Sequence, residues 1–234
     1  MSRKSMAVIT AMRRELAPLL KGIRGQRSDG IEFFELEDAV VAVGGIGRKS
    51  ARKAAIAVIE KYQPAILVSA GIAGALTATL KVGEVVRGSE AIDVESGARF
   101  ATTGGESVIA TVTSVSGPVE KRLLAERYKA DVVDMESAAV AAVAREHGIE
   151  FTAIKAISDE LEFEMPPLVR FVDEDGKFET MRFAAYVAIH PKWWSSVRQL
   201  GGNSNLAAVN LSHAVRHLMV ERSTTTPEEN IPLV

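Results

Sequence analysis

Short apolar runs recur along this chain, separated by stretches that mix polar and apolar residues. Each run is brief and bounded by turn residues, which predicts strands rather than helices. The predicted strands are Met6–Ala11, Ile31–Leu36, Ala39–Val43, Ala65–Ala70, Ala130–Val133 and Phe151–Ile157, with further β-rich pieces between Glu84 and Val115. Most of these runs carry apolar residues on both faces of the predicted strand, so both faces need cover. Their alternation with helices therefore predicts an α/β sandwich.

Helices are predicted between the strands, and proline and glycine mark several of their ends. The predicted helices cover Arg13–Lys21, Arg48–Tyr62, Pro118–Tyr128 and Glu136–His147, and two or three more follow up to about Val220. The stretch Gly71-Ile72-Ala73-Gly74 is expected to be a loop after the fourth strand.

The domain organisation follows from the absence of a repeat or a long polar linker. Residues 1–222 are therefore expected to form a single domain. The last stretch, 223–234, carries three threonines and two prolines and is expected to be a loose tail.

Composition narrows the class of protein. With 47% hydrophobic and 25% charged residues the chain is expected to fold, and a net charge of −2 argues against a nucleic-acid partner. There is no cysteine, which excludes disulfides, thiolate nucleophiles and zinc–thiolate sites. No apolar run reaches the roughly 18 residues needed to span a bilayer. We expect a cytoplasmic protein without a membrane span.

Generic ligand motifs are incomplete. Gly45-Ile46-Gly47-Arg48 imitates a dinucleotide fingerprint but lacks its third glycine, and no acid follows the next strand to hold a ribose. Backbone amides at this helix start would attract an anion, although a tight turn explains the glycines equally well. His213 and His217 share a helix face without a third ligand, so no metal site is predicted.

Three acids stand just beyond the carboxyl ends of predicted strands. They are Glu15, Glu136 and Asp159. Each alone could serve a helix start or a turn. Ligands of α/β sheets bind at this edge, so the three acids together indicate one pocket.

Six short motifs around these acids carry a family resemblance. They are Ala11-Met12-Arg13-Arg14-Glu15, Gly45-Ile46-Gly47-Arg48, Ser69-Ala70-Gly71-Ile72-Ala73-Gly74, Leu80-Lys81-Val82-Gly83-Glu84, Val133-Asp134-Met135-Glu136-Ser137-Ala138 and Ala156-Ile157-Ser158-Asp159. In this order they resemble the nucleoside phosphorylase/nucleosidase superfamily, nearest to methylthioadenosine/S-adenosylhomocysteine nucleosidases. The resemblance covers about Met6 to Asp159. It implies a three-layer α/β sandwich around a central mixed, partly barrel-like sheet, and cleavage of the N-glycosidic bond of a purine nucleoside.

The resemblance also implies roles on the sugar side of the site. Met135 and Glu136 would hold the ribose, and Met12 would pack against it. Bond cleavage builds positive charge on the sugar, which an ionised glutamate stabilises. Glu136 at a helix start is expected to stay ionised. Glu15 would orient or deprotonate the attacking water.

On the base side the resemblance implies a general acid. Asp159, oriented by Ser158, would hydrogen-bond the purine at N7 and pass it a proton, with Gly71 and Ile72 nearby. General acid catalysis is typically worth about 10²–10⁴-fold. Asp159 is expected to sit in a desolvated place that favours its protonated form. No cofactor is implied, although phosphate is an alternative co-substrate.

Departures from the family pattern bear on the nucleophile. Ile72 stands where nucleosidases and many phosphorylases carry serine, and no arginine lies just upstream. A carboxylate about 4 Å from a phosphate charge costs about 4 kcal/mol at an effective dielectric near 20, so Glu15 also disfavours phosphate. Hydrolysis is therefore predicted, with phosphorolysis and an anion site at Gly45, Gly47 and Arg48 as the alternative. The aromatic residue that stacks on adenine has no evident counterpart.

The region after Asp159 departs furthest and is similar to hopanoid-associated phosphorylases, which act on a nucleoside joined to a lipid. Six residues there would line an apolar 5′-side pocket, with ordinary core or a subunit interface as the alternative: Phe163, Met165, Leu168, Phe171, Trp193 and Trp194. The family assembles as oligomers, so a homo-oligomer is expected, with Ile72–Leu80 and Trp193-Trp194 as interface candidates. A non-catalytic nucleoside-binding module is the second alternative to hydrolysis.

Overall fold

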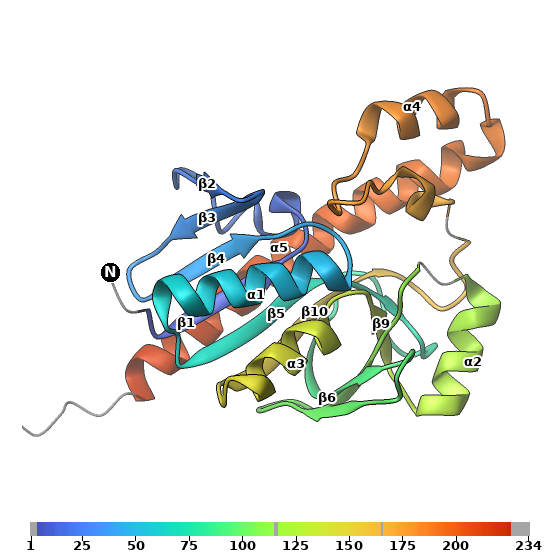
Figure 1. Cartoon of the computed structure of the whole chain (residues 1–234). Helices are drawn as coiled ribbons and strands as arrows, with labels where there is room; N and C mark the ends of the chain where they lie inside the picture. The colour runs from blue at the N-terminus through green and yellow to red at the C-terminus, as the bar shows by residue number, and fades with distance from the viewer. Residues whose placement is uncertain (1–3, 115–116, 165, 226–234) are drawn as a thin grey trace, which may run out of the picture.

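A computed structural model describes residues 4–114, 117–164 and 166–225 (Figure 1). Its strands join into one mixed sheet in the order β10-β6-β8-β9-β5-β1-β4-β3-β2, with β7 paired to β6. The strands are β1 (Met6–Thr10), β2 (Gln26–Ser28), β3 (Ile31–Glu35), β4 (Ala39–Val43), β5 (Ile66–Ala75), β6 (Val85–Asp93), β7 (Arg99–Ala101), β8 (Ser107–Thr111), β9 (Val132–Asp134) and β10 (Glu150–Asp159).

Part of this sheet closes on itself. β10 pairs with β6 on one side and with β5 on the other, and β5 continues through β9 and β8 back to β6. The result is a closed ring of five strands, from which β1, β4, β3 and β2 extend as an open sheet. The predicted mixed, partly barrel-like sheet is confirmed.

Helices cover both faces of the sheet. On one face, α1 (Arg48–Tyr62) and α3 (Ser137–Glu146) share an apolar core with β1, β4, β5 and β10. On the other face lies the long α5 (Trp194–Thr225), where Ala207, Leu211, Val215 and Leu218 are buried against the sheet. α2 (Pro118–Tyr128) packs on the outside of the ring through Leu124. In Figure 1, α1 and α3 lie in front of the sheet and α5 passes behind it, which gives three layers.

Two strands run further than their sequence pattern predicts. β5 continues through the expected loop Gly71–Gly74, because β10 pairs with it as far as Gly74 and β9 pairs with its last residues. β10 likewise includes Ser158 and Asp159. The prediction of a loop at Gly71–Gly74 is therefore wrong. Pairing with β10 and β9 keeps both glycines in a strand, although glycine has a low strand propensity.

The ends of other elements also differ from the prediction. The helix expected over Arg13–Lys21 is a short 3-10 helix, η1 (Arg13–Leu16), followed by turns that carry the chain past Pro18. β2 was not predicted, because its three residues are polar and form no apolar run; all three are exposed. α5 extends to Thr225, into the expected tail, and residues 226–234 of that tail lie outside the described residues.

The chain after Asp159 forms a projection that we call the arm (residues 166–205). It contains η2 (Leu168–Phe171), α4 (Thr180–Ala188), η3 (Pro191–Trp193) and the first turns of α5, and it stands beyond the sheet in Figure 1. Phe171 holds it together through ring contacts to Phe183 and Tyr186, with centroids 5.3 Å apart in both pairs. The arm touches the main body where the Ile46 N–H donates to the carbonyl of Gly176 at 2.7 Å.

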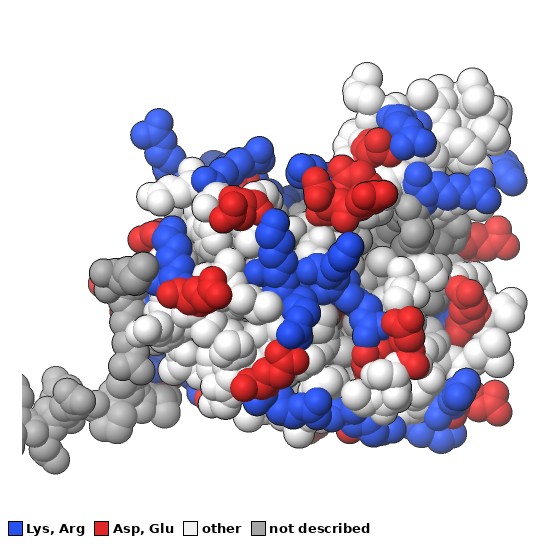
Figure 2. All heavy atoms as spheres, in the orientation of Figure 1, with Lys and Arg blue, Asp and Glu red and all other residues white. Residues whose placement is uncertain are grey.

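The surface carries charges of both signs. Figure 2 shows blue and red side chains interspersed on one face, with blue ones gathered over α1, where Lys49, Arg52 and Lys53 are exposed. Arg52 pairs with Glu146 of α3 at 2.8 Å, so part of this charge is compensated locally. Across the described part of the chain, no helix combines the length and the apolar character that a membrane crossing requires.

Candidate active site

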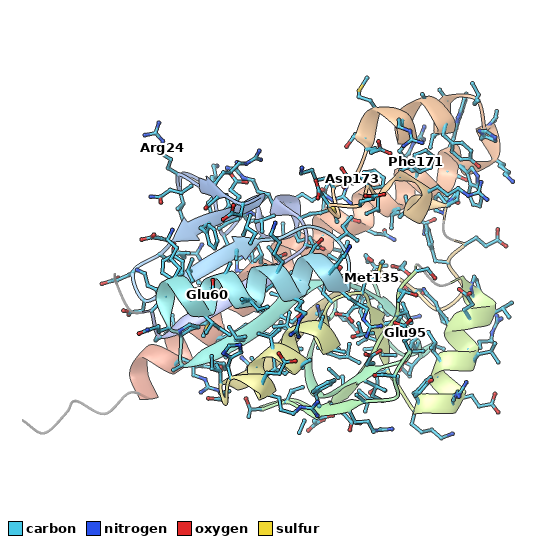
Figure 3. All side chains as sticks on the ribbon, viewed as in Figure 1. Arg24, Glu60, Glu95, Met135, Phe171 and Asp173 are labelled. Carbon is cyan, nitrogen blue, oxygen red and sulfur yellow. The ribbon has the colours of Figure 1, made fainter. Side chains whose placement is uncertain are left out.

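A pocket of about 150 Å³ opens where β1, β9 and β10 end and the arm begins. Seven of the residues that the sequence singled out line it together: Met12, Glu15, Ile72, Met135, Glu136, Ser158 and Asp159. In Figure 3 the labelled Met135 lies near the start of α1, below the part of the arm that carries Phe171 and Asp173. Residues distant in sequence thus meet between the sheet edge and the arm.

Glu15 lies on the floor of this pocket and is 4% exposed. It follows β1 within η1, and its Oε2 accepts hydrogen bonds from the Thr10 hydroxyl at 2.7 Å and the Met12 N–H at 2.9 Å. Its Oε1 accepts the Ile72 N–H at 3.4 Å, so β5 also fixes its position. The carboxylate is held rigidly and faces the cavity.

Glu136 is the residue immediately before α3, and it lines the same cavity. Its Oε1 accepts the Gly47 N–H at 2.7 Å, and its Oε2 accepts the Met135 N–H at 3.3 Å. Burial, followed by the negative charge of Asp134, raises the pKa of Glu136 to about 7. Desolvation and the neighbouring carboxylate thus oppose the stabilisation that a helix start offers to an ionised glutamate.

A buried charged network supports the floor. Lys155 Nζ lies 2.8 Å from Asp134 Oδ2, and both side chains are at most 1% exposed. Burial by itself raises the pKa of Asp134, but the charge of Lys155 and hydrogen bonds from Ser137 and Thr111 outweigh it and hold that pKa below its ordinary value. Lys155 also donates to the Ser69 hydroxyl at 3.0 Å.

Asp159 ends β10 and is 3% exposed. Its Oδ1 accepts the Ser158 hydroxyl at 2.6 Å, as the predicted orienting role of Ser158 requires. Its Oδ2 accepts from Lys121 Nζ at 2.5 Å. Asp159 is desolvated as expected, but it is also ion-paired.

Sequence reasoning missed both lysines. Lys155 interrupts the apolar run Phe151–Ile157, where a lone charge inside a buried strand is itself a signal. Lys121 shares the buried side of α2 with Leu124, Ala125 and Tyr128, at the i, i+3, i+4, i+7 spacing of an apolar helix face. A pattern search for buried charges would have identified them.

The glycine turn Gly44–Gly47 is not arranged as an anion site. Its four successive amides all donate to protein oxygens: Gly44 to Thr10, Gly45 to Ala11, Ile46 to Gly176 and Gly47 to Glu136. Arg48 forms ion pairs with Asp93 and Glu95. None of Gly45, Gly47 and Arg48 lines the pocket, and Gly47 acts there only through its bond to Glu136.

Gly71 lies beneath the pocket in β5. A Cβ atom there would sit 3.6 Å from both Glu15 Oε1 and Lys155 Nζ, so the position is close to the charged floor without lining the cavity. Gly74 is more restricted, since a Cβ atom would come within 2.8 Å of Asp159 Oδ2.

The arm supplies an apolar wall opposite the acids. Its residues in the pocket are Leu168, Val172, Phe178, Leu200 and Ser204. Of the six residues expected on a 5′ side, Leu168 alone of the described ones lines the cavity, and Met165 lies outside the described residues. Phe171 packs within the arm instead, and Trp194 Nε1 donates to the carbonyl of Val187. Phe178 is the aromatic residue that the pocket does contain.

The histidine pair lies apart from this pocket on α5, where His217 Nδ1 is 2.9 Å from Glu221 Oε1. Within the ranges that the structure describes, no group of three or more potential ligands could hold a metal ion.

Comparison with known proteins gives a family match. The sequence model of the phosphorylase superfamily matches residues 5–112 and 106–188. Among individual proteins, the 5′-methylthioadenosine/S-adenosylhomocysteine nucleosidase of Shewanella halifaxensis is 26% identical, over 69% of this chain and 88% of the relative. The enzyme of the same name from Shewanella oneidensis is 27% identical, over 69% and 86%.

Solved structures share the fold. The 5′-methylthioadenosine/S-adenosylhomocysteine nucleosidase of Neisseria meningitidis, in complex with methylthio-immucillin-A, superposes with a TM-score of 0.71 at 21% identity, covering 93% of this chain and 99% of that one. The futalosine hydrolase of Helicobacter pylori superposes with a TM-score of 0.65 at 20% identity, covering 92% and 98%.

Proposed function

Because the chain belongs to the phosphorylase superfamily, we propose that it is an enzyme that hydrolyses the N-glycosidic bond of an adenosine-type purine nucleoside. The observation that carries this proposal is the convergence of Glu15, Glu136 and Asp159 on one pocket. The reaction needs a group for the water, a group for the sugar and a group for the base. A module that only binds nucleosides has no use for all three.

The proposed chemistry divides among the acids by position. As the bond between C1′ and N9 breaks, Glu136 in its ionised form stabilises the positive charge on the ribose, against which Met12 and Met135 pack. Glu15 takes a proton from the water that adds to C1′. Asp159, oriented by Ser158, delivers a proton to N7 of the leaving base.

Water is the better nucleophile for this pocket. The carboxylate of Glu15 would repel a phosphate at the same place. The amides of Gly44 to Gly47 already have protein acceptors, and Arg48 already pairs with Asp93 and Glu95. These contacts leave the glycine turn without the donors that an anion needs, so phosphorolysis is not favoured.

A 5′ substituent suits the apolar wall of the arm. Leu168, Val172, Phe178 and Leu200 face the acids across the cavity. Methylthioadenosine and S-adenosylhomocysteine, the compounds in the names of the nucleosidases above, are therefore the first substrates to test. The cytoplasmic location and the homo-oligomeric assembly stay predictions.

The deciding experiment is a substrate panel. The protein is incubated with adenosine, methylthioadenosine, S-adenosylhomocysteine, inosine and guanosine, each with and without phosphate, and free base is measured. We expect base release from an adenosine-type nucleoside without phosphate. Strict dependence on phosphate would establish phosphorolysis instead, and binding without any release would establish a non-catalytic module.

A further inference from the structure

Asp159, the acid on the base side of the site, forms a buried ion pair with Lys121, a residue to which the proposed reaction gives no role. Lys121 Nζ lies 2.5 Å from Asp159 Oδ2, and the two side chains are 1% and 5% exposed. Lys121 also donates to the carbonyl of Glu160 at 2.7 Å, and both members of the pair line the pocket. Burying two charges is costly, so a pair kept at the edge of a substrate pocket calls for a functional reason.

The hydrogen bonds of Asp159 pose a specific problem for a general acid. Ser158 donates to Oδ1 and Lys121 donates to Oδ2, so both oxygens act as acceptors in this arrangement. An ionised carboxylate has no proton to give. The ammonium group of Lys121 is the contact of Asp159 that carries a transferable proton.

We propose that Lys121 is the proton reservoir for Asp159, an inference that rests on the nucleosidase function proposed above. As the C1′–N9 bond breaks, one proton moves from Lys121 Nζ to Asp159 Oδ2 and from Asp159 to N7. The electron pair of the broken bond stays with the base, which leaves neutral. Asp159 ends as a carboxylate and Lys121 as a neutral amine, which takes a proton from solvent before the next turnover. Lys121 thus acts through Asp159.

The packing around the pair keeps the two groups in contact. A Cβ atom at Gly74 would lie 2.8 Å from Asp159 Oδ2 and 3.1 Å from Lys121 Cε, so β5 presses against both side chains. Lys121 is anchored from α2, and its second bond to Glu160 spans the end of β10. A proton therefore has a short and constant path between the two atoms.

Other charged groups surround the pair at greater exposure or across the cavity. Beyond the pair, the charged residues lining the pocket are Arg14, Glu15, Asp134 and Glu136. Next to the pair in sequence, Glu160 pairs with Lys81 and Arg122 pairs with Glu162. These groups are the same in the wild type and in variants of Lys121. The ratio of the variant's rate of base release to the wild-type rate, taken at each pH, therefore isolates the role of Lys121.

The test compares two substitutions that a structural role would rank in the opposite order. Lys121→Arg keeps the charge and the hydrogen bonds, but a guanidinium does not release its proton. Lys121→Met removes both the charge and the proton, and leaves Asp159 free to take a proton from solvent as the pH falls. Base release is measured from about pH 5 to about pH 8 on the nucleoside that the wild type cleaves best, with thermal unfolding as the check on folding. Arg122→Met, at the neighbouring exposed position of α2, is the matched control.

We expect Lys121→Arg to lose at least about tenfold in kcat and to be no better than Lys121→Met near pH 8. The deficit of Lys121→Met should shrink several-fold toward pH 5, while Arg122→Met matches wild type. Full activity of Lys121→Arg, or a deficit of Lys121→Met that is constant with pH, would overturn the proposal. Should Lys121→Arg not fold, the pH profile of Lys121→Met decides alone. If the wild type releases no base from any nucleoside, the proposed function fails, and this inference fails with it.

Discussion

Four carboxyl groups line one pocket, and their surroundings separate their behaviour. Asp134 is paired with a buried lysine below the floor, and Asp159 with another at the wall. Glu15 is held by hydrogen bonds to Thr10 and the backbone. Among the described residues, no lysine or arginine pairs with Glu136, whose pKa is raised. At the residue scale, environment rather than residue type assigns the roles.

Glu15 decides between water and phosphate. If water attacks, Glu15→Gln should reduce base release by at least about 100-fold, because a general base is typically worth 10²–10⁴-fold. Nucleoside affinity should change by no more than a few-fold, since the lost role belongs to the transition state. Kinetics and equilibrium binding on the same preparation measure both. A variant that cleaves as fast as wild type, or faster with phosphate, would show that the nucleophile is phosphate.

Glu136 should make the protein less stable as the pH rises. Its pKa is raised to about 7 in the folded protein, above the ordinary value near 4.3. Between these values the folded state binds the extra proton, so stability falls with rising pH. Glu136→Gln should therefore raise the unfolding temperature more at pH 8 than at pH 5. Glu60→Gln, on the exposed side of α1, is the control and should show no such pH difference. An equal shift of Glu136→Gln at both pH values would contradict the assignment.

At the scale of elements, β5 is the strand that brings the site together. It pairs with β1, β9 and β10, and it passes under Glu15 at Gly71 and beside Asp159 at Gly74. The register places Asp159 opposite Gly74, after an irregularity between Ile157 and Asp159. The absence of a side chain at Gly74 is what gives Asp159 and Lys121 their space.

Gly74→Ala should therefore impair catalysis more than folding. The new Cβ atom would lie 2.8 Å from Asp159 Oδ2 and 3.2 Å from Val133 Cγ1, so the carboxylate must shift. We expect kcat to fall at least about tenfold, because a misplaced group loses its alignment with the base. The matched control is Gly201→Ala in α5, where a Cβ atom meets nothing within 4 Å. That change should leave activity intact and stabilise the helix by about 1 kcal/mol. Unchanged activity of Gly74→Ala would argue against Asp159 as a precisely held acid.

At the scale of the whole molecule, the arm leaves large apolar side chains on the surface. Met181 is 82% exposed, Ile189 76% and Trp194 54%. The other interface candidate, Ile72–Leu80, begins inside β5, where its first residues are covered by the sheet. Of the two predicted interface regions, the arm with Trp193-Trp194 is therefore the better candidate, since exposed apolar patches mark contact surfaces.

We expect the protein to form at least a dimer in solution. Light scattering at micromolar concentration should give about twice the chain mass of 25.1 kDa or more. Replacing Ile189 and Trp194 by serine should shift the mass toward the monomer if the arm forms the contact, while Val220→Ser at the far end of α5 serves as the control. A monomer in the wild type would refute the expectation.

The sequence by itself determined the fold class, most element positions and the three acids. Helix α1 begins and ends where predicted, because its amphipathic pattern and Pro64 are local signals. Glu15 and Asp159 could be placed at one sheet edge because β1 and β10 both run parallel to β5, whereas Glu136 follows β9, which pairs antiparallel with β5 and reaches the same pocket from the other direction. Apolar runs and the ends of α1 are encoded locally, and these local signals survive folding.

Only the tertiary structure decided the rest. Strand pairing turned the expected loop at Gly71–Gly74 into strand, and burial beside Asp134 raised the pKa of Glu136. The pairing of Lys121 with Asp159 joins positions 38 residues apart and is invisible in either segment alone. Charge, desolvation and close packing depend on which groups meet in space, and therefore only the folded chain sets them.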